Sequence, residues 1–545
     1  DDRSVERVDA RSAGLPRGGA AVKRAFLLIL LASVANASGL ADHGEDLFQR
    51  EKIEIAVTGF LRVRGDWLNN LDLDRGVTPS GQPLFPVPLG DPTGQNLFSA
   101  DMRLRTDVAI YAPFAAAAVK LRADLIDDLQ FGSMPILSPG SGNAPTPAAT
   151  PGQIPYSLFR IKRAYGEVLT PVGYFAAGRM GNMWGLGMMA NGGDCLDCNL
   201  GDAADRVAFV TSLAGHLWAL AYDFSAVGPT SYRKDSQRQL VLDPSTSVNS
   251  VSFAFMNIKD EHTRKRRRLA DRLTVEYGLL ASYRWQNQDA PAAYLPTTQP
   301  QVLMPASVMT RGYKAAVFNV WLRIQAPVFR IEAEGAVLIA DAEQASLLPG
   351  VLLRDRVQSL QAGGVLETTF GKPGSAILGG FNAGAASGDP APGFGAFPGA
   401  NTNPKQGDLD GAQVDIPRDT RVDNFRFHPD YRVDRILFAE IVGTTTDAWY
   451  VRPWAKFRLL NFRSYDLVLA TDATFSRAFY ASSTPGNDAG LGMEAHAALT
   501  WSSKDGFDVL AEYAVLFPFA GFNNPAQSLT AQPAQLGRVR LAWRF

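Results

Sequence analysis

The sequence predicts an all-β chain whose antiparallel strands close into a transmembrane up-and-down barrel of about eighteen strands. Three observations predict this fold. Long stretches alternate polar and apolar residues with a period of two, which is the period of a β-strand. Short and long connections between these stretches alternate along the chain. The mean hydropathy of -0.06 excludes many membrane-spanning helices and suits a barrel in which half of each strand is polar.

The last stretch of the chain shows the alternation most clearly. Val539 and Leu541 fall on one face of the predicted strand, whereas Arg538, Arg540 and Arg544 fall on the other. A soluble β-sandwich would hardly point three arginines into its core. The lumen of a transmembrane barrel is polar and its outer face meets lipid. We therefore expect Arg538 and Arg540 inside the barrel and Leu541 against lipid.

Composition limits both the number of domains and the class of partner. The chain has 545 residues, with 53 Lys and Arg against 54 Asp and Glu, and this near-neutral balance argues against nucleic acid as the main partner. No linker separates halves of different composition. We therefore predict a single barrel domain over residues 53–545.

The apolar run 25–34 has the features of a secretory signal peptide. It follows Lys23 and Arg24 and precedes the small-residue run 35–37, and it is too short to span a bilayer. Residues 1–37 are therefore expected to be cleaved. Residues 38–52 would then form a short periplasmic segment before the barrel.

The first predicted strand begins at Ile53, and seventeen further strands follow in a regular rhythm. They are predicted at 98–112, 115–128, 158–169, 174–183, 206–213, 216–225, 248–258, 273–286, 313–326, 328–340, 357–370, 375–387, 448–460, 464–477, 489–502, 507–517 and 535–545. Every tight turn follows an even-numbered strand, and every long loop follows an odd-numbered one. This asymmetry is typical of outer-membrane barrels, with short periplasmic turns and long extracellular loops.

Three local features complete the prediction of the fold. Pro453 lies inside a predicted strand, so we expect a bulge or bend there. The basic stretch 262–268 is predicted to be a solvated turn rather than a binding segment. Aromatic residues gather at strand ends, as they do in interface girdles. They are Trp67, Phe98, Phe114, Tyr283, Trp285, Trp501, Trp543 and Phe545.

Two segments resemble Gram-negative porins. Arg163-Ala164-Tyr165-Gly166-Glu167-Val168 is followed by a turn and then by Tyr174-Phe175-Ala176-Ala177-Gly178-Arg179. In porins the arginines of such strand pairs line the pore, which implies a pore-lining Arg179. The strand number and the long loop 390–446 more closely resemble the alginate-export class of barrel. The resemblance implies passage of a solute across the outer membrane of a Gram-negative bacterium.

Closure of the barrel would place the last strand beside the first and gather cationic side chains on one wall. This predicted basic wall contains Arg62, Arg64, Arg103, Arg105, Lys120, Arg122, Arg538, Arg540 and Arg544. On the same faces only Asp66, Asp107 and Asp124 are expected to neutralise it, and then only in part. Like charges side by side cost energy unless something compensates them, so the wall predicts an anion path. The other interpretation is that charges pair across strands and merely fill a polar interior.

Further residues are predicted to line the pore on other strands. They are Arg179, Arg323, Arg330, Glu332, Glu334, Arg452, Lys456 and Arg458.

The two cysteines, Cys195 and Cys198, lie in the predicted loop 184–205. A C-x-x-C pair can be a redox site, half a zinc site or a small disulfide. No histidine is close in sequence to complete a zinc site, and no βαβ unit is present to carry a redox motif. In an oxidising cell envelope we therefore expect a disulfide that holds this loop in one shape.

No bound cofactor is required by this prediction, and one metal site is considered. Asp194, Asp197, Asn199 and Asp202 surround the cysteines and offer hard oxygen ligands that suit Ca²⁺, although solvated acidic loop tips are the favoured interpretation. Catalysis is not expected. The pair His428 and Asp430 in the long loop keeps a barrel protease as a remaining alternative.

Taken together, these patterns predict a porin-like channel in the outer membrane. It would contact membrane lipid and lipopolysaccharide and pass small or oligomeric anionic solutes. The alternative is a non-conducting surface barrel whose long outer loops bind a ligand or partner.

Overall fold

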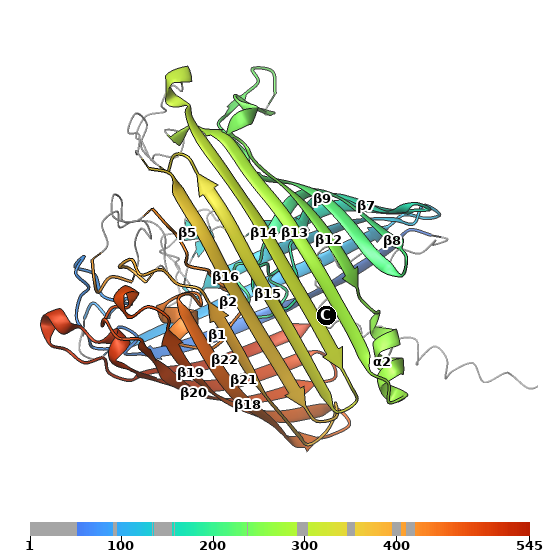
Figure 1. Ribbon diagram of the computed structural model, residues 1–545. Helices are drawn as coiled ribbons and strands as arrows, with labels where there is room; N and C mark the ends of the chain where they lie inside the picture. Colours follow the sequence, from blue (N-terminus) through green and yellow to red (C-terminus); the bar gives the residue numbers. More distant parts are fainter. Residues whose placement is uncertain are drawn as a thin grey trace, which may run out of the picture.

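The chain forms a closed barrel of eighteen antiparallel strands (Figure 1). The computed structural model describes residues 52–90, 95–132, 134–135, 155–156, 159–236, 238–291, 304–345, 355–394, 405–409 and 420–545. The predicted signal peptide and nearly all of the segment 38–52 lie outside the described residues. The boundaries given to them therefore stay predictions.

The barrel strands agree with the predicted ones to within a few residues at each end. They are β1 (Glu54–Asn69), β2 (Asn96–Tyr111), β3 (Ala117–Gln130), β6 (Arg160–Thr170), β7 (Gly173–Gly181), β8 (Ala203–Leu213), β9 (His216–Ala226), β12 (Val248–Asn257), β13 (Thr274–Asp289), β14 (Met309–Gln325), β15 (Phe329–Ala342), β16 (Val357–Phe370), β17 (Ile377–Ala386), β18 (Ala448–Asn461), β19 (Tyr465–Ala478), β20 (Gly490–Ser503), β21 (Phe507–Pro518) and β22 (Ala534–Arg544). Four short strands lie outside the barrel sheet: β4 (Met134–Pro135), β5 (Pro155–Tyr156), β10 (Thr230–Tyr232) and β11 (Gln239–Val241).

The last strand closes the barrel against the first. β22 pairs antiparallel with β1, with Leu541 opposite Val63 and Arg540 opposite Arg64. β1 pairs with β2 along its other edge, so neither strand is left with a free edge. A closed ring satisfies the backbone N–H and C=O groups of all its strands, which is the condition for spanning a bilayer with β-structure. The predicted barrel is confirmed.

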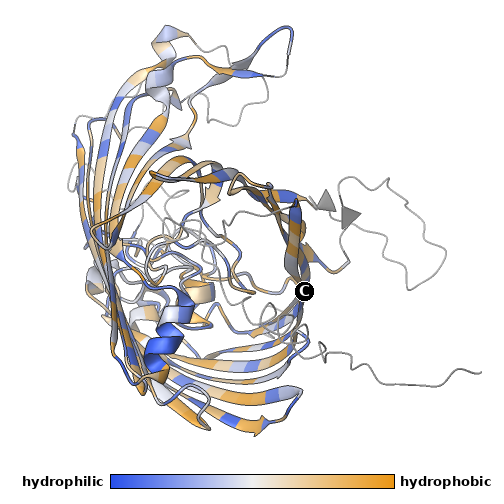
Figure 2. Ribbon diagram, turned by 90° about the vertical axis from the view of Figure 1, so that its right-hand side faces the viewer, coloured by the Kyte–Doolittle hydropathy of each residue, from blue (hydrophilic) through white to orange (hydrophobic). Residues whose placement is uncertain are grey.

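Side chains alternate between the two faces of the barrel wall as predicted. On β22, Arg538 is 4% exposed, whereas Val539 and Leu541 are 55% and 50% exposed. Figure 2 shows hydrophilic and hydrophobic residues alternating along the strands, with loop segments inside the ring. The polar face is therefore the inner one, and the apolar face surrounds the barrel.

The strand β18 departs from the sequence-based expectation at Pro453. No bulge forms there, because Pro453 stays in register with Phe381 of β17. On the side of β19, Arg452 and Pro453 have no ladder partner, but the pairing resumes at Trp454 in the same register. Proline lacks the N–H of a ladder bond, so the ladder is interrupted locally. The register shift lies between Arg458 and Leu460, close to the short turn.

The basic connection between β12 and β13 also differs from the predicted turn, because it contains the helix α2 (Glu261–Leu269). The carboxylate of Asp260 caps this helix by accepting hydrogen bonds from the N–H of Thr263 at 2.5 Å and from its hydroxyl at 2.7 Å. Arginine and lysine are good helix formers, so the capped stretch continues as a helix. Among the described residues, no helix is long and apolar enough to cross a membrane.

Apolar loop residues fill the inside of the barrel at the long-loop end. Phe425, Phe427, Leu437 and Phe438, from the segment between β17 and β18, pack with Met188 of the loop between β7 and β8. The short π-helix Leu437–Ile441 lies within this cluster. This apolar cluster confines the open part of the lumen to the short-turn end.

A substitution on the outer face tests the register of β22. Replacing Leu541 with arginine should destabilise the barrel in a bilayer by about 2–4 kcal/mol, because the charge would face lipid near the membrane centre. Urea-dependent folding into phospholipid vesicles measures this, with Leu541→Ala as the control that removes apolar area without adding charge. Equal stability of the two variants would contradict the outward position of Leu541.

Candidate functional site

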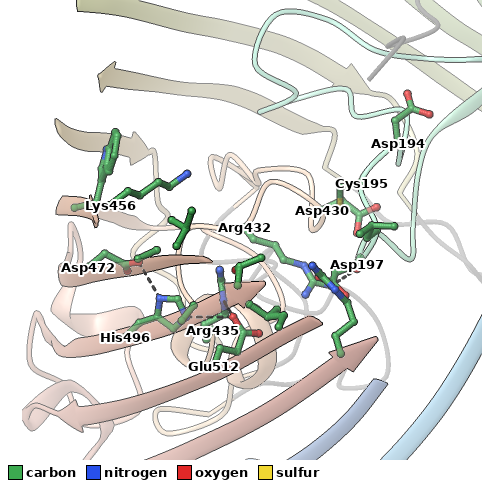
Figure 3. Close-up of a pocket in the computed structure, with 18 of the residues that line it drawn as sticks. Asp194, Cys195, Asp197, Asp430, Arg432, Arg435, Lys456, Asp472, His496 and Glu512 are labelled. Atoms are coloured by element: carbon green, nitrogen blue, oxygen red, sulfur yellow. Dashed lines mark hydrogen bonds and ion pairs between the residues drawn. The ribbon is translucent and has the colours of Figure 1, made fainter. Parts of the chain in front are cut away.

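A cavity of about 1470 Å³ lies inside the barrel at the short-turn end. Phe545, Thr369 and Ser375 line it near the short turns, and Leu196 and Tyr431 line it from two loops that fold inward. Figure 3 shows Cys195 and Asp197 of one loop across the cavity from Lys456 and His496 on the barrel strands. The two loops thus form a roof between this cavity and the apolar cluster.

The first roof loop, residues 182–202 between β7 and β8, carries a disulfide between Cys195 and Cys198. Arginines of the wall bind its main chain. The Arg62 guanidinium donates to the carbonyl of Leu196 at 2.9 Å, and that of Arg103 donates to the carbonyl of Cys198. These bonds fix the stapled loop to the inner face of β1 and β2.

Two more arginines hold the preceding part of the same loop. Arg105 donates to the carbonyl of Gly193 at 2.6 Å, and Arg163 of β6 donates to the carbonyl of Gly192 at 2.5 Å. Four arginines of the inner face, three from the basic wall and Arg163 from β6, therefore bind main-chain carbonyls of one loop. Charged hydrogen-bond donors form the stronger class of hydrogen bond, so the loop position is well determined.

The second roof segment runs through residues 430–441 and is held by carboxylates. Glu494 of β20 accepts hydrogen bonds from the N–H groups of Arg435 and Ile436 at 2.7 and 3.0 Å. Asp434 accepts from the N–H groups of Phe438 and Ala439 at 3.0 and 3.1 Å. Burial raises the pKa of Asp434 to about 6. Its charged form is therefore disfavoured in the folded chain.

The cations of the predicted basic wall all have acidic partners, which differs from the partial neutralisation expected. The ion pairs are Arg62 with Asp101 and Asp128, Arg64 with Asp66, Asp101 and Asp197, Arg103 with Asp124, Asp127 and Asp128, Arg105 with Asp124, Lys120 with Glu167, Arg122 with Asp107 and Asp194, Arg538 with Asp66, Glu440 and Glu512, Arg540 with Asp197, and Arg544 with Asp508. The wall is therefore a paired network, with its cations close together but compensated.

Some of these acidic partners could have been found in the sequence and others could not. Asp101 has the same parity as Arg103 and Arg105, so alternation alone places it on the inner face. Asp128 has the parity of Arg122 and Asp124, so alternation places it on the inner face as well. Asp127 has the opposite parity and reaches the lumen where the β2–β3 ladder shifts register twice and Asp128 takes a positive φ of 50°. Strict alternation predicts no such displacement.

The other predicted pore-lining residues fall into three groups. Arg330, Arg452, Lys456 and Arg458 line the cavity. Arg323, Glu332 and Glu334 point inward but lie outside the cavity lining. Arg323 binds Glu332 at 2.8 Å, and Glu334 accepts from the N–H of Leu186 at 2.7 Å in the roof loop.

Arg179 is the exception, and its predicted place in the pore is wrong. Its side chain shares the outward face of β7 with Phe175, and it binds Asp205 of β8 at 2.7 Å. The side chains of this pair are 52% and 46% exposed. The porin-like pattern identified the strand pair, but the parity of β7 directs Arg179 away from the lumen.

Cationic side chains outnumber acidic ones in the cavity lining, eleven to seven. Lys456 is exposed and lies 5.6 Å from the centre of the Trp454 ring, and Arg458 donates to the carbonyl of Gly374 at 3.0 Å. Within the described part of the chain, Lys456 and Arg458 form no ion pair. Arg432 of the second roof segment likewise forms no ion pair among the described residues and donates to the carbonyl of Asp197 at 2.7 Å. The excess positive charge therefore lies on β18 and at Arg432, whereas the cations of the basic wall are paired.

The residues considered for Ca²⁺ are not arranged around a common point. Asp194 pairs with Arg122 and Arg163, and Asp197 pairs with Arg540. These carboxylates are thus compensated by guanidinium groups. The side chain of Asn199 accepts from Arg103 at 3.3 Å, and Asp202 lies 3.6 Å from His428. Among the described residues, no group of three or more metal-binding side chains is present. Calcium binding at these residues stays a prediction, and solvated acidic loop tips remain its favoured alternative.

The histidines inside the barrel serve structural contacts. His496 lies between Asp472 at 2.9 Å and Glu512 at 3.1 Å (Figure 3). His428 accepts through Nδ1 from the N–H of Asp430 at 3.0 Å. The Asp430 carboxylate itself accepts from the N–H groups of Asn199 and Leu200, both at 2.9 Å. The pair considered for a protease thus joins the two roof loops.

Comparison with solved structures finds outer-membrane channels. The outer membrane protein OpdK from Pseudomonas aeruginosa is 10% identical, with a TM-score of 0.41 over 90% of this chain and 99% of that chain. The channel DcaP of Acinetobacter baumannii is 10% identical, with a TM-score of 0.37 over 91% and 99%. A BenF-like porin from Pseudomonas fluorescens Pf-5 is 8% identical, with a TM-score of 0.43 over 90% and 98%.

The other comparisons identify no family for the chain. No family model matches it. No curated protein matches it either. The similar structures are porins and channels, and the finer resemblance to the alginate-export class is not supported.

Removing a wall arginine tests whether the network holds the roof. Arg103→Ala should cost about 3–5 kcal/mol of unfolding free energy, because it removes a cationic partner from the buried carboxylates of Asp124 and Asp127 and from the half-buried Asp128. Arg179→Ala breaks only the exposed outer pair and should cost about 0.2–1 kcal/mol. Equilibrium unfolding in vesicles measures both. Equal losses would contradict the structural role of Arg103.

A pH series tests the burial of Asp434. Its pKa in the folded chain, about 6, lies above the ordinary value of 3.8, so its stabilising contribution is complete at low pH and is lost as the pH rises through 6. Relative to Asp434→Asn, the wild type should therefore lose stability between pH 4 and pH 7. Parallel pH profiles of the two proteins would show that Asp434 is ordinarily solvated.

Proposed function

We propose that this protein is an outer-membrane channel for small or oligomeric anionic solutes. The observation that carries the proposal is the cavity beneath the roof loops, with its eleven cationic and seven acidic lining residues. A net positive lining inside a low-dielectric wall raises the local concentration of anions. No catalytic step is part of the proposal.

The unpaired cations of β18 supply the attraction. Lys456 and Arg458 face the cavity and form no ion pair with any residue that the structure describes. Asn382, Thr368 and Thr369 add neutral polar groups nearby. An anion that enters this part of the lumen meets donors which are not already bound to a carboxylate. Such a lining favours entry without the tight binding that would stop conduction.

The paired wall has a different role in this proposal from the one expected. Arg62, Arg103 and Arg105 are bound to carboxylates and to carbonyls of the roof loop. They therefore set the shape of the lumen and contribute little net field. The anion preference rests on β18 and not on β1 to β3.

The barrel would be placed in the outer membrane of a Gram-negative bacterium. Its apolar outer face would contact lipid, and the long-loop end would face lipopolysaccharide. In this orientation the cavity opens toward the periplasm, because the short turns lie on that side.

The second candidate is a non-conducting surface barrel. The apolar cluster of loop residues at the long-loop end favours it, since that cluster fills part of the lumen. Planar-bilayer recording of the purified protein distinguishes the two functions. Discrete conductance steps support the channel, and their absence at high protein concentration supports the surface barrel.

Charge reversal on β18 tests the origin of the selectivity. Under a KCl gradient, the reversal potential of the wild type should show a preference for chloride. This preference should be stronger at low salt, because the Debye length rises to about 30 Å at 0.01 M and the cavity charges are then screened less. The double variant Lys456→Glu/Arg458→Glu should abolish or invert this bias.

The matched control reverses two exposed cations in short turns, Arg463→Glu and Lys504→Glu, and should keep most of the bias. A cation-selective wild type would contradict the proposed solute class. Equal effects of both pairs would assign the selectivity to overall charge and not to the cavity.

A further inference from the structure

The connection between β12 and β13 differs in charge from the other short connections of the barrel. Residues 258–273 carry seven cationic and three acidic side chains. The other seven short connections together carry three cationic and one acidic side chain. Cationic charge is thus concentrated at one place on the short-turn rim, where Figure 1 shows α2 beyond the end of β13.

Part of this charge is compensated within the chain and part is not. Arg264 binds Glu276 at 3.2 Å, and Arg267 donates to the carbonyl of Leu273 at 2.7 Å. Lys265, Arg266 and Arg268 form no ion pair within the described residues. This contrasts with the lumen wall, where all nine cations are paired. The helix therefore presents positive charge to its surroundings.

An aromatic cluster fixes the level of α2 along the barrel axis. On the outward face, the ring of Phe255 lies 4.6 Å from that of His216 and 4.8 Å from that of Trp218. The His216 ring nitrogen Nε2 lies 2.7 Å from the Tyr277 hydroxyl. Aromatic side chains with polar atoms occupy the membrane–water interface. Since α2 follows these strand ends directly, it lies at the level of lipid headgroups.

Apolar residues continue from the barrel face to the helix. Leu269 is 78% exposed and Leu273 is 47% exposed, and Val275 extends the same outward surface on β13. Exposed leucines beside lysine and arginine are typical of segments that lie in the membrane interface. A soluble acidic partner would account for the cations but not for the leucines.

We infer that α2 binds the headgroups of anionic phospholipids in the leaflet on the short-turn side, through Lys265, Arg266 and Arg268. Anionic headgroups carry a net negative charge, whereas the amine of a zwitterionic headgroup neutralises its own phosphate. Lysine and arginine near such a surface favour the anionic lipid. The inference requires the barrel to lie in a membrane and does not require it to conduct.

Native mass spectrometry of the full mature barrel from mixed micelles tests this inference. The micelles contain equal amounts of phosphatidylglycerol and phosphatidylcholine with the same acyl chains. The wild type should retain phosphatidylglycerol in preference by about fivefold or more. The variant Lys265→Gln/Arg266→Gln/Arg268→Gln should lose this preference, because glutamine keeps the helix but removes the charge.

The matched control, Lys372→Gln/Arg463→Gln/Lys504→Gln, removes three exposed cations from other short turns and should keep the preference. Heat-modified electrophoretic mobility verifies that each variant is folded. No preference in the wild type, or equal loss in both variants, would overturn the inference. If α2 bound polyglutamate and the wild type showed no lipid preference, the surface would be assigned to an acidic protein. That result would also overturn the inference.

Discussion

A continuous chain of ion pairs and hydrogen bonds crosses the inner face of the barrel, and the arrangement of the loops depends on it. Successive members are Arg452, Asp472, His496, Glu512, Arg538, Asp66, Arg64, Asp101, Arg62, Asp128, Arg103, Asp124 and Arg105. These residues come from eight neighbouring strands, β18 to β22 and β1 to β3. The guanidinium groups have donors left over, and they use these to bind carbonyls of the disulfide-stapled loop.

This network explains why the many arginines of the lumen do not give it a correspondingly large net positive charge. Removing a charge from water costs several kcal/mol, so buried cations are retained only beside anions. Arg62 and Arg103 are fully buried, and both obey this rule. Among the described residues, unpaired positive charge persists where the lumen is open to water, as at Lys456 and Arg458. The unpaired residues therefore determine the potential, and the paired ones determine the shape.

The strands of the barrel were predictable, and the contacts of its loops were not. Period-two alternation determines which face of β22 is turned to the aqueous lumen. Arg538 and Leu541 could exchange faces only if every other side chain of the strand changed face as well. It cannot show that Asp197 of a distant loop binds Arg540, since that contact depends on how the loop folds back. The porin-like resemblance failed at Arg179, whereas the parity that Arg179 shares with Phe175 places it outward. The wall residues were identified, but their compensation was missed.

The central claim is that anions gather beneath the roof loops beside the unpaired cations of β18, and not along the paired wall. Anomalous diffraction from crystals soaked in bromide tests it most directly. We predict bromide peaks next to Lys456 and Arg458, and none within contact distance of Arg62 or Arg103. Peaks along the paired wall with none at β18, or an empty cavity that instead takes up rubidium from a parallel soak, would contradict the account.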